Sequence, residues 1–403
     1  MDTGSIAFML FATSLVMLMT PGLAFFYGGL VGKKNALTIM MQSFVSIAWT
    51  TILWVSVGFS MAFGNDVGGI VGDGKYLFLN NISTATPFGP HGEIPLLLFM
   101  VYQMMFAIIT PALITGAFSR RVRFKSYMIF LTVWLLFVYF PLVHMVWGGG
   151  IFQQMGVLDF GGGIVVHAIA GFSALAFVFF IGKRKYTDEK AHNIPLFTIG
   201  AALLWFGWFG FNAGNAFSSN EVAVNAFVNT QIGAAFAAIT WMLLDIFKSG
   251  KPKTIGFFTG GLAGLVVTTP TAGYITVQTA MLLGITVAVV SYCAILFKNR
   301  KSWDDTLDVW GVHGIGGYLG ILLLGIFSTK TVNIDGADGL VFGNAKFFIN
   351  EFVAVTLAVL YAFIFTYVAL WAINKIIPVR VSEETERNGL DEAEFGEDAY
   401  GLI

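Results

Sequence analysis

Two histidines carry the most informative chemistry in this chain, because each lies in an otherwise apolar stretch. His167 occurs in GGGIVVHAIAG and His313 in VWGVHGIGGYLG. An ionisable side chain within a membrane span is costly and usually marks a functional site. Neutral imidazole has one donor and one acceptor nitrogen, so a pair can share a hydrogen bond and pass a proton. We therefore expect the two histidines to meet as a proton relay, although either one alone could simply bond a backbone carbonyl.

The sequence gives little support for cysteine, metal or enzyme chemistry. The single cysteine, Cys293, excludes a disulfide framework or a thiolate metal cluster. No nucleophile–base pair appears in the apolar stretches, so the sequence does not indicate an enzyme. We expect no metal and no cofactor.

The composition indicates a protein that spans a membrane many times. Of 403 residues, 57% are hydrophobic and only 11% are charged, which is typical of a polytopic membrane protein. The net charge of −1 argues against a nucleic-acid partner, which needs a basic surface. The lipid bilayer is therefore the first expected partner.

Apolar runs long enough to cross a bilayer, which takes about 20 residues, recur along the chain and predict an all-α fold. We expect eleven transmembrane helices, at residues 6–31, 36–63, 95–118, 126–149, 161–182, 195–213, 222–247, 254–273, 275–297, 307–328 and 345–376.

The basic residues predict how the chain is oriented. All but Lys75, Lys330 and Lys346 of the 22 Lys and Arg residues fall in loops after odd-numbered spans, at the end of the eleventh span or in the C-terminal tail. Because cytoplasmic loops are enriched in Lys and Arg, we expect the N-terminus outside and the C-terminus in the cytoplasm.

The two histidines also suggest an internal repeat. His167 falls in the fifth span and His313 in the tenth, as in an inverted-topology repeat of five plus five helices with one extra helix. We therefore divide the chain into a transmembrane domain, residues 1–378, and a cytoplasmic C-terminal tail, residues 379–403. On composition alone, this acidic tail could also be a solvated, poorly ordered end.

Aromatic side chains gather near the predicted ends of several spans. Trp147 ends the fourth span in HMVWGGG, and the sixth ends in LWFGWFGFNAGNA. A tryptophan at a span end is usually an interfacial anchor. Aromatic faces also attract small cations, so these residues could instead form a cation-binding mouth.

Ten stretches together resemble the ammonium transporter family (Amt/Mep/Rh), and microbial Amt proteins most of all. These stretches, in chain order, are PGLAFFYGGLV, FGND, VYQMMFAIITPA, HMVWGGG, LDFGGGIVVH, IGKR, LWFGWFGFNAGNA, TPTAGY, LDVWGVHGIGG and EETERNGLD. The resemblance implies a homotrimer in which each eleven-helix protomer has its own pore.

The resemblance also implies roles for individual residues. It places ammonium recruitment at Trp147, Asn215, Phe106 and Asp159, a gate at Phe106 and Phe211, the twin-histidine pair at His167 and His313, and further pore and vestibule positions at Gln103, Trp208, Phe26 and Tyr27. Asp159 could act only as an N-terminal cap of the fifth helix. Asn215 departs from the serine of many family members, but its amide oxygen can still accept a hydrogen bond from ammonium.

The implied function is facilitated uptake of ammonium, with methylammonium as an analogue, across the cell membrane. The ion would be recruited, deprotonated and conducted as ammonia past the histidines, with or without the separated proton. The implied tail partner is a PII-type signalling protein at the cytoplasmic face. The alternatives are an ammonium sensor that signals through the tail and a channel for another small neutral solute.

Overall fold

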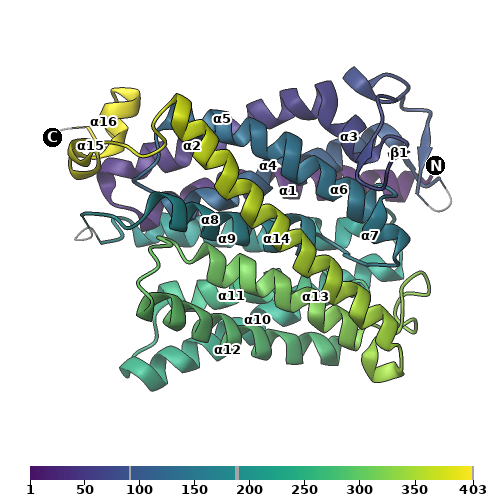
Figure 1. The fold of residues 1–403 in the computed structure, drawn as a ribbon. Helices are drawn as coiled ribbons and strands as arrows, with labels where there is room; N and C mark the ends of the chain where they lie inside the picture. The colour runs from purple at the N-terminus through teal and green to yellow at the C-terminus, as the bar shows by residue number, and fades with distance from the viewer. Residues whose placement is uncertain (90–91, 187–189, 402–403) are drawn as a thin grey trace.

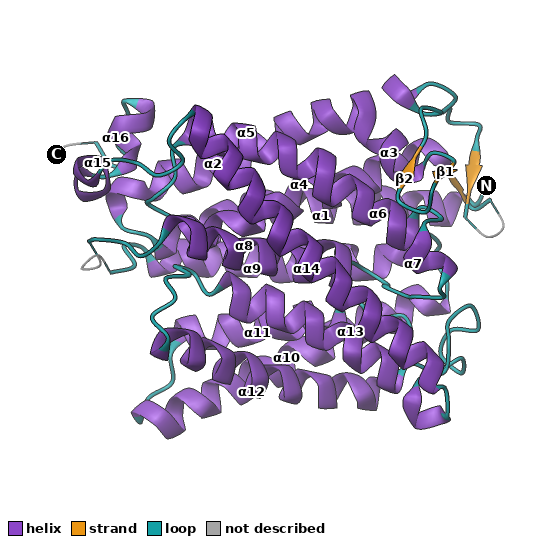
Figure 2. Ribbon diagram, in the orientation of Figure 1, coloured by secondary structure: helices purple, strands orange, loops and turns teal. Residues whose placement is uncertain are grey.

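Long helices lie side by side in one bundle and fix most of the architecture (Figure 1). The computed structural model describes residues 1–89, 92–186 and 190–401. The two termini lie at opposite ends of the helices, so we call the end with the N-terminus the N-face and the other end the C-face. The strands are short and lie at the N-face (Figure 2), where β1, Asp66–Val67, pairs with β2, Val71–Gly72, and β3, Pro87–Phe88, pairs with β4, Ile94–Pro95.

In the described part of the chain, ten helical segments are long and apolar enough to cross a membrane. This confirms an all-helical, multi-pass membrane protein. The segments are Thr3–Leu30 (α1), Lys33–Phe63 (η1, α2, η2 and α3), Leu96–Phe118 (α4), Phe124–Gln154 (α5, η4, α6 and α7), Gly163–Ile181 (η5 and α8), Ile194–Ala216 (α9 and η6), Glu221–Ser249 (α10), Val277–Arg300 (α12), Trp310–Phe327 (η7 and α13) and Ala345–Ile376 (α14).

Several of these segments contain more than one element. The separate bounds are η1 Lys33–Asn35, α2 Ala36–Leu53, η2 Trp54–Gly58, α3 Phe59–Phe63, α5 Phe124–Trp134, η4 Leu135–Tyr139, α6 Phe140–Trp147, α7 Ile151–Gln154, η5 Gly163–Ala168, α8 Ile169–Ile181, α9 Ile194–Ala213, η6 Gly214–Ala216, η7 Trp310–Gly314 and α13 Ile315–Phe327. Single 3-10 turns, η3 Leu77–Leu79 and η8 Leu340–Phe342, lie in the loops.

The eighth predicted span is shorter than expected. Residues 254–273 were predicted to be helical, but α11 covers only Thr254–Thr268, about 22 Å at 1.5 Å per residue. Pro270 accounts for the early end, because proline lacks the backbone N–H that would continue the helical hydrogen-bond ladder. The next six residues form a turn, and that turn contributes to the site described below.

Small residues let the helices approach closely. A Cβ on Gly200 of α9 would lie 2.2 Å from the Phe26 nitrogen of α1, and one on Gly264 of α11 would lie 2.5 Å from the Gly233 oxygen of α10. Such contacts are typical of membrane helices, whose association depends on van der Waals packing rather than on the hydrophobic effect. The last of the long helices, α14, crosses the bundle diagonally over α8 (Figure 1).

The C-terminal tail folds back onto the C-face as two short helices, α15, Glu383–Asn388, and α16, Leu390–Phe395. The buried carboxylate of Glu386 accepts hydrogen bonds from the Lys185 backbone and from the Arg380 guanidinium, at 2.5 and 2.7 Å. The described part of the tail, which ends at residue 401, is therefore docked on the transmembrane helices.

Asp391 makes the most specific contact of the tail. Its buried carboxylate accepts hydrogen bonds from the backbone nitrogens of Leu37 and Thr38, at 3.0 and 2.8 Å, and from the Thr38 hydroxyl at 2.7 Å. These nitrogens lie in the first turn of α2, where N–H groups lack partners within the helix. The tail thus supplies a cap to a helix more than 350 residues earlier.

Asp391→Ala should release the tail, because it removes a helix cap worth about 1 kcal/mol together with a buried bond to Thr38. We expect faster tryptic cleavage after Arg387 in the purified protein. Asp398→Ala, which alters an exposed aspartate of the same tail, is the control. Equal cleavage rates in the two variants would contradict the capping role.

Candidate functional site

Three cavities line up through the bundle. The N-face cavity has a volume of about 260 Å³, and the C-face cavity has a volume of about 230 Å³. The central cavity between them has a volume of only about 10 Å³, which is room for roughly one water molecule. The central and C-face cavities share Phe26, Leu262 and His313 as lining residues. The narrow middle therefore limits what can pass.

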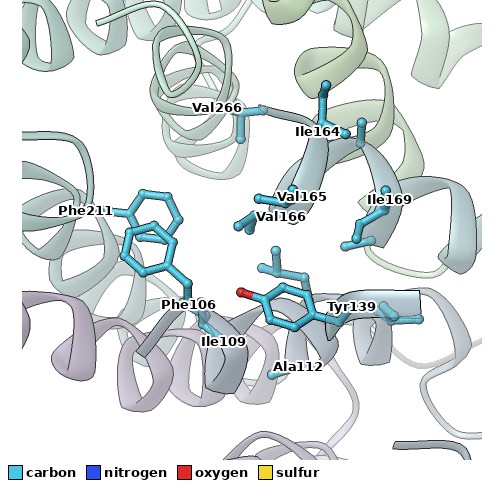
Figure 3. Packing of buried hydrophobic residues seen from close by; sticks show 14 of the residues in the cluster. Phe106, Ile109, Ala112, Tyr139, Ile164, Val165, Val166, Ile169, Phe211 and Val266 are labelled. Carbon is cyan, nitrogen blue, oxygen red and sulfur yellow. The ribbon is translucent and has the colours of Figure 1, made fainter. Parts of the chain in front are cut away.

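Two phenylalanine rings separate the N-face cavity from the central one. Phe106 and Phe211 are buried, with ring centroids 4.3 Å apart, and face one another among apolar side chains (Figure 3). Phe211 lines the central cavity, whereas Trp147, whose ring is perpendicular to Phe106 at 6.1 Å, lines the N-face cavity. One or both rings must move before a solute can pass between the two cavities.

The N-face cavity brings polar atoms next to aromatic faces. Trp147 donates its indole N–H to the Asp159 carbonyl at 2.8 Å, which fixes the orientation of its ring. The Asn215 side-chain nitrogen donates to the Phe211 carbonyl at 2.7 Å, so its oxygen is left as the acceptor in a cavity that Asn215 lines. Gln103 lines the same cavity, and its buried Oε1 has no hydrogen-bond partner among the described residues.

Asp159 organises the start of the helix that carries His167. Its carboxylate accepts hydrogen bonds from the backbone nitrogens of four successive residues, 162–165, at 2.6–3.4 Å. Burial raises the pKa of the Asp159 carboxyl to about 6, although the four N–H donors act in the opposite direction. These four donors favour the charged form of the carboxylate, which lies at the wall of the N-face cavity.

A second aspartate plays the same part for His313. Asp305 accepts hydrogen bonds from the backbone nitrogens of Val309 and Trp310 at 3.1 and 2.8 Å. Like Asp159, it lies eight residues before its histidine, and both histidines lie in π-helical segments, η5 and η7. Such segments are frequent at functional sites. The sequence analysis missed Asp305, although the shared spacing was visible.

The two histidines meet in the central cavity. Their Nδ1 atoms lie 3.3 Å apart, the rings are nearly parallel at 22°, and both side chains are buried. One Nδ1 must donate and the other accept, so two neutral rings carry their remaining proton on only one Nε2. Nε2 of His167 has no partner among the described residues. The pair therefore offers both a donor and an acceptor to a passing molecule.

Glycines allow the two histidine-bearing helices to approach each other closely. A Cβ on Gly171 would lie 2.1 Å from the nitrogen of Gly314, and one on Gly317 would lie 2.7 Å from the nitrogen of Ala168. No larger residue fits at these points without moving the backbone. The helices after η5 and η7 can thus cross closely enough for the imidazoles to touch.

The remaining predicted site residues line the same route. The Trp208 ring stacks on His167 at 5.4 Å, and its N–H donates to Thr269 at 2.8 Å. Phe26 lines both the central and the C-face cavities, and Tyr27 lines the C-face cavity. The residues that the sequence analysis assigned to the site thus line these three cavities or pack against their lining residues.

Sequence reasoning also missed the side chain that holds the backbone at Phe211. Tyr102 donates its hydroxyl to the carbonyls of Gly210 and Phe211, at 2.9 and 3.1 Å. Tyr102 occurs in the quoted VYQMMF stretch, but nothing in the sequence indicates that its partners lie over 100 residues away.

The fold and the site define a class: a helical membrane protein with a small, largely apolar cavity between two larger ones. Residues 7–400 match the Ammonium Transporter Family. The chain is 43% identical to ammonium transporter Amt1 of Archaeoglobus fulgidus, covering 99% of this chain and 100% of that one, and 42% identical to the ammonium transporter of Bacillus subtilis, covering 99% of each. The chain therefore belongs to the ammonium transporter family, as the sequence analysis predicted.

Solved structures agree with this assignment. The crystal structure of Candida albicans Mep2 matches with a TM-score of 0.89 at 33% identity, over 95% of this chain and 87% of that one. A structure described as a sensor Amt protein matches with a TM-score of 0.88 at 27% identity, over 97% and 98%.

Trp147→Leu should weaken cation binding, because it removes an aromatic face worth about 0.5–2 kcal/mol. We expect the KM of methylammonium uptake to rise several-fold in proteoliposomes. Trp371→Leu, which alters an exposed tryptophan of α14, is the matched control. An unchanged KM in Trp147→Leu would leave Trp147 as an interfacial anchor only.

Proposed function

We propose that the protein takes up ammonium by binding the ion in the N-face cavity, removing its proton near the Phe106–Phe211 gate and conducting ammonia past His167 and His313. The narrow central cavity carries this conclusion. Apart from the two imidazoles and Trp208, whose N–H is already bonded to Thr269, its described lining residues are apolar. Such a passage suits a small neutral molecule that needs only a donor and an acceptor.

Two costs decide in which form the solute crosses. Moving a small cation intact into a low-dielectric medium costs on the order of 20 kcal/mol in the idealised limit. Removing a proton at pH 7 from an amine whose pKa resembles that of lysine, ~10.4, costs roughly 5 kcal/mol. Deprotonation is therefore the cheaper route. Potassium has no proton to lose and faces the whole desolvation cost.

The roles follow from the geometry. In the N-face cavity, the Trp147 face attracts the cation, the Asn215 oxygen accepts one of its hydrogen bonds, and the Asp159 charge favours it electrostatically. Phe106 and Phe211 keep water and ions out of the centre. The histidine pair then hydrogen-bonds ammonia and provides a separate path for the released proton.

His167→Ala should abolish ammonium-evoked current in proteoliposomes, because it leaves the narrow passage without its shared imidazole hydrogen bond. His313→Ala should do the same. His192→Ala, which alters a histidine of a C-face loop, is the control. If His167→Ala kept the wild-type current, the histidines would be structural and proton transfer would need another route.

The finer architecture is part of the same proposal. We propose eleven crossings in a five-plus-five inverted repeat with α14 as the extra helix, assembled as a homotrimer. The paired arrangement of Asp159 with His167 and Asp305 with His313 supports the repeat.

We also propose that residues 1–378 form the transmembrane domain and that residues 379–403 form a regulatory tail that binds a PII-type protein. The docking of α16 on α2 supports a link between tail and pore.

The N-face should lie outside the cell and the C-face in the cytoplasm, because the basic residues gather at the C-face. In a Cys293→Ser background, an impermeant maleimide applied to intact cells should label Lys75→Cys and miss Glu384→Cys. Permeabilised cells, in which both should react, are the control. Labelling at residue 384 in intact cells would reverse the assigned orientation.

Ammonium sensing is a second candidate, favoured by the likeness to the sensor Amt structure and by the docked tail. Methylammonium uptake by purified protein in liposomes separates the two functions. A transporter shows saturable uptake, whereas a sensor that does not transport shows none above empty liposomes.

A further inference from the structure

Glu351 is a buried carboxyl group that the proposed mechanism does not use. It lies in the second turn of α14, within an apolar membrane-spanning helix, and its side chain is fully buried. An ionisable residue in such a place is costly and is a functional candidate by default. Its hydrogen bonds indicate what it does.

Glu351 and its neighbour hold one loop. Glu351 Oε1 accepts a hydrogen bond from the backbone nitrogen of Leu158 at 2.6 Å, and Asn350 donates its side-chain N–H to the carbonyl of Met155 at 2.6 Å. Both contacts link α14 to the segment 155–158, almost 200 residues earlier. In the described residues, Glu351 Oε2 has no partner, so Oε1 makes the only hydrogen bond found for this carboxyl group.

The held segment leads directly into the binding cavity. The residue after Leu158 is Asp159, whose carbonyl orients the Trp147 ring and whose carboxylate binds the first backbone nitrogens of the His167 helix. A shift of segment 155–158 would therefore move the cation-binding wall and the start of the pore helix together. We expect Trp147 to move most directly with this segment, because its indole N–H is bonded to the backbone carbonyl of Asp159.

We propose that Glu351 is a positioning residue for the ammonium-binding cavity, acting through the Leu158 N–H on Asp159 and Trp147. This role rests on the proposed transport function. It depends on a hydrogen-bond acceptor rather than on charge, because the partner is a neutral backbone N–H. Glutamine, which keeps an acceptor oxygen at the same reach, should therefore replace glutamate, and methionine should not.

The test is the concentration dependence of labelled methylammonium uptake by the full chain in proteoliposomes. Glu351→Met should raise KM by about five-fold or more, the effect of one lost buried hydrogen bond, and change the maximal rate much less. Glu351→Gln should stay within about two-fold of wild type. Glu221→Met, which makes the same chemical change at an exposed glutamate of α10, is the matched control.

A milder variant keeps the idea testable if Glu351→Met does not fold. Asn350→Ala removes the second contact to the same segment at a partly exposed position, and it should also raise KM with little change in maximal rate. An unchanged KM in every folded variant that has lost its contact would overturn the role, as would Glu351→Gln being as impaired as Glu351→Met. Absence of saturable uptake by the wild type would instead count against the transport function.

Discussion

The cost of placing a charge in a narrow apolar passage is the constraint on which the rest of this structure depends. The bundle contains two cavities of about 230 and 260 Å³, and between them lies a cavity with room for about one water-sized molecule. Potassium and ammonium ions face the same barrier there, but only ammonium can shed its charge by losing a proton. On the proposed mechanism, selectivity therefore arises from chemistry at the Phe106–Phe211 gate as much as from the size of the passage.

Such a passage requires polar groups in few and fixed positions, and the helix termini fix them. Asp159 and Asp305 each bind the backbone nitrogens that open a histidine-bearing helix. Gly171 and Gly314 then let the two helices approach until the imidazoles share a hydrogen bond. Glu351 adds a further support, because it ties the loop that carries Asp159 to α14. The chemistry at the centre thus depends on a shell of buried acceptors, each satisfying backbone N–H groups.

Apolar runs and histidines within them are local signals, so the sequence predicted the membrane class, most of the spans and the histidine pair. The other residues of the central route were proposed only from the resemblance to the ammonium transporter family. The eighth span was placed too long, since the apolar run continued past Pro270 while the helix stopped at Thr268. The supports of the site were harder to find. Tyr102 and Glu351 reach partners over 100 residues away, and only the fold brings those together. Asp305, in contrast, could have been found from the sequence, because its spacing from His313 repeats that of Asp159 from His167.

The most direct test of the central claim compares two cations in the same proteoliposomes. Uptake of labelled methylammonium and flux of labelled rubidium, a potassium analogue without a proton, are measured on one preparation against empty liposomes. The account predicts saturable methylammonium uptake and no rubidium flux above the empty-liposome level, even with rubidium in tenfold excess. Rubidium flux that rises together with methylammonium uptake would contradict it, because the pore would then conduct intact cations.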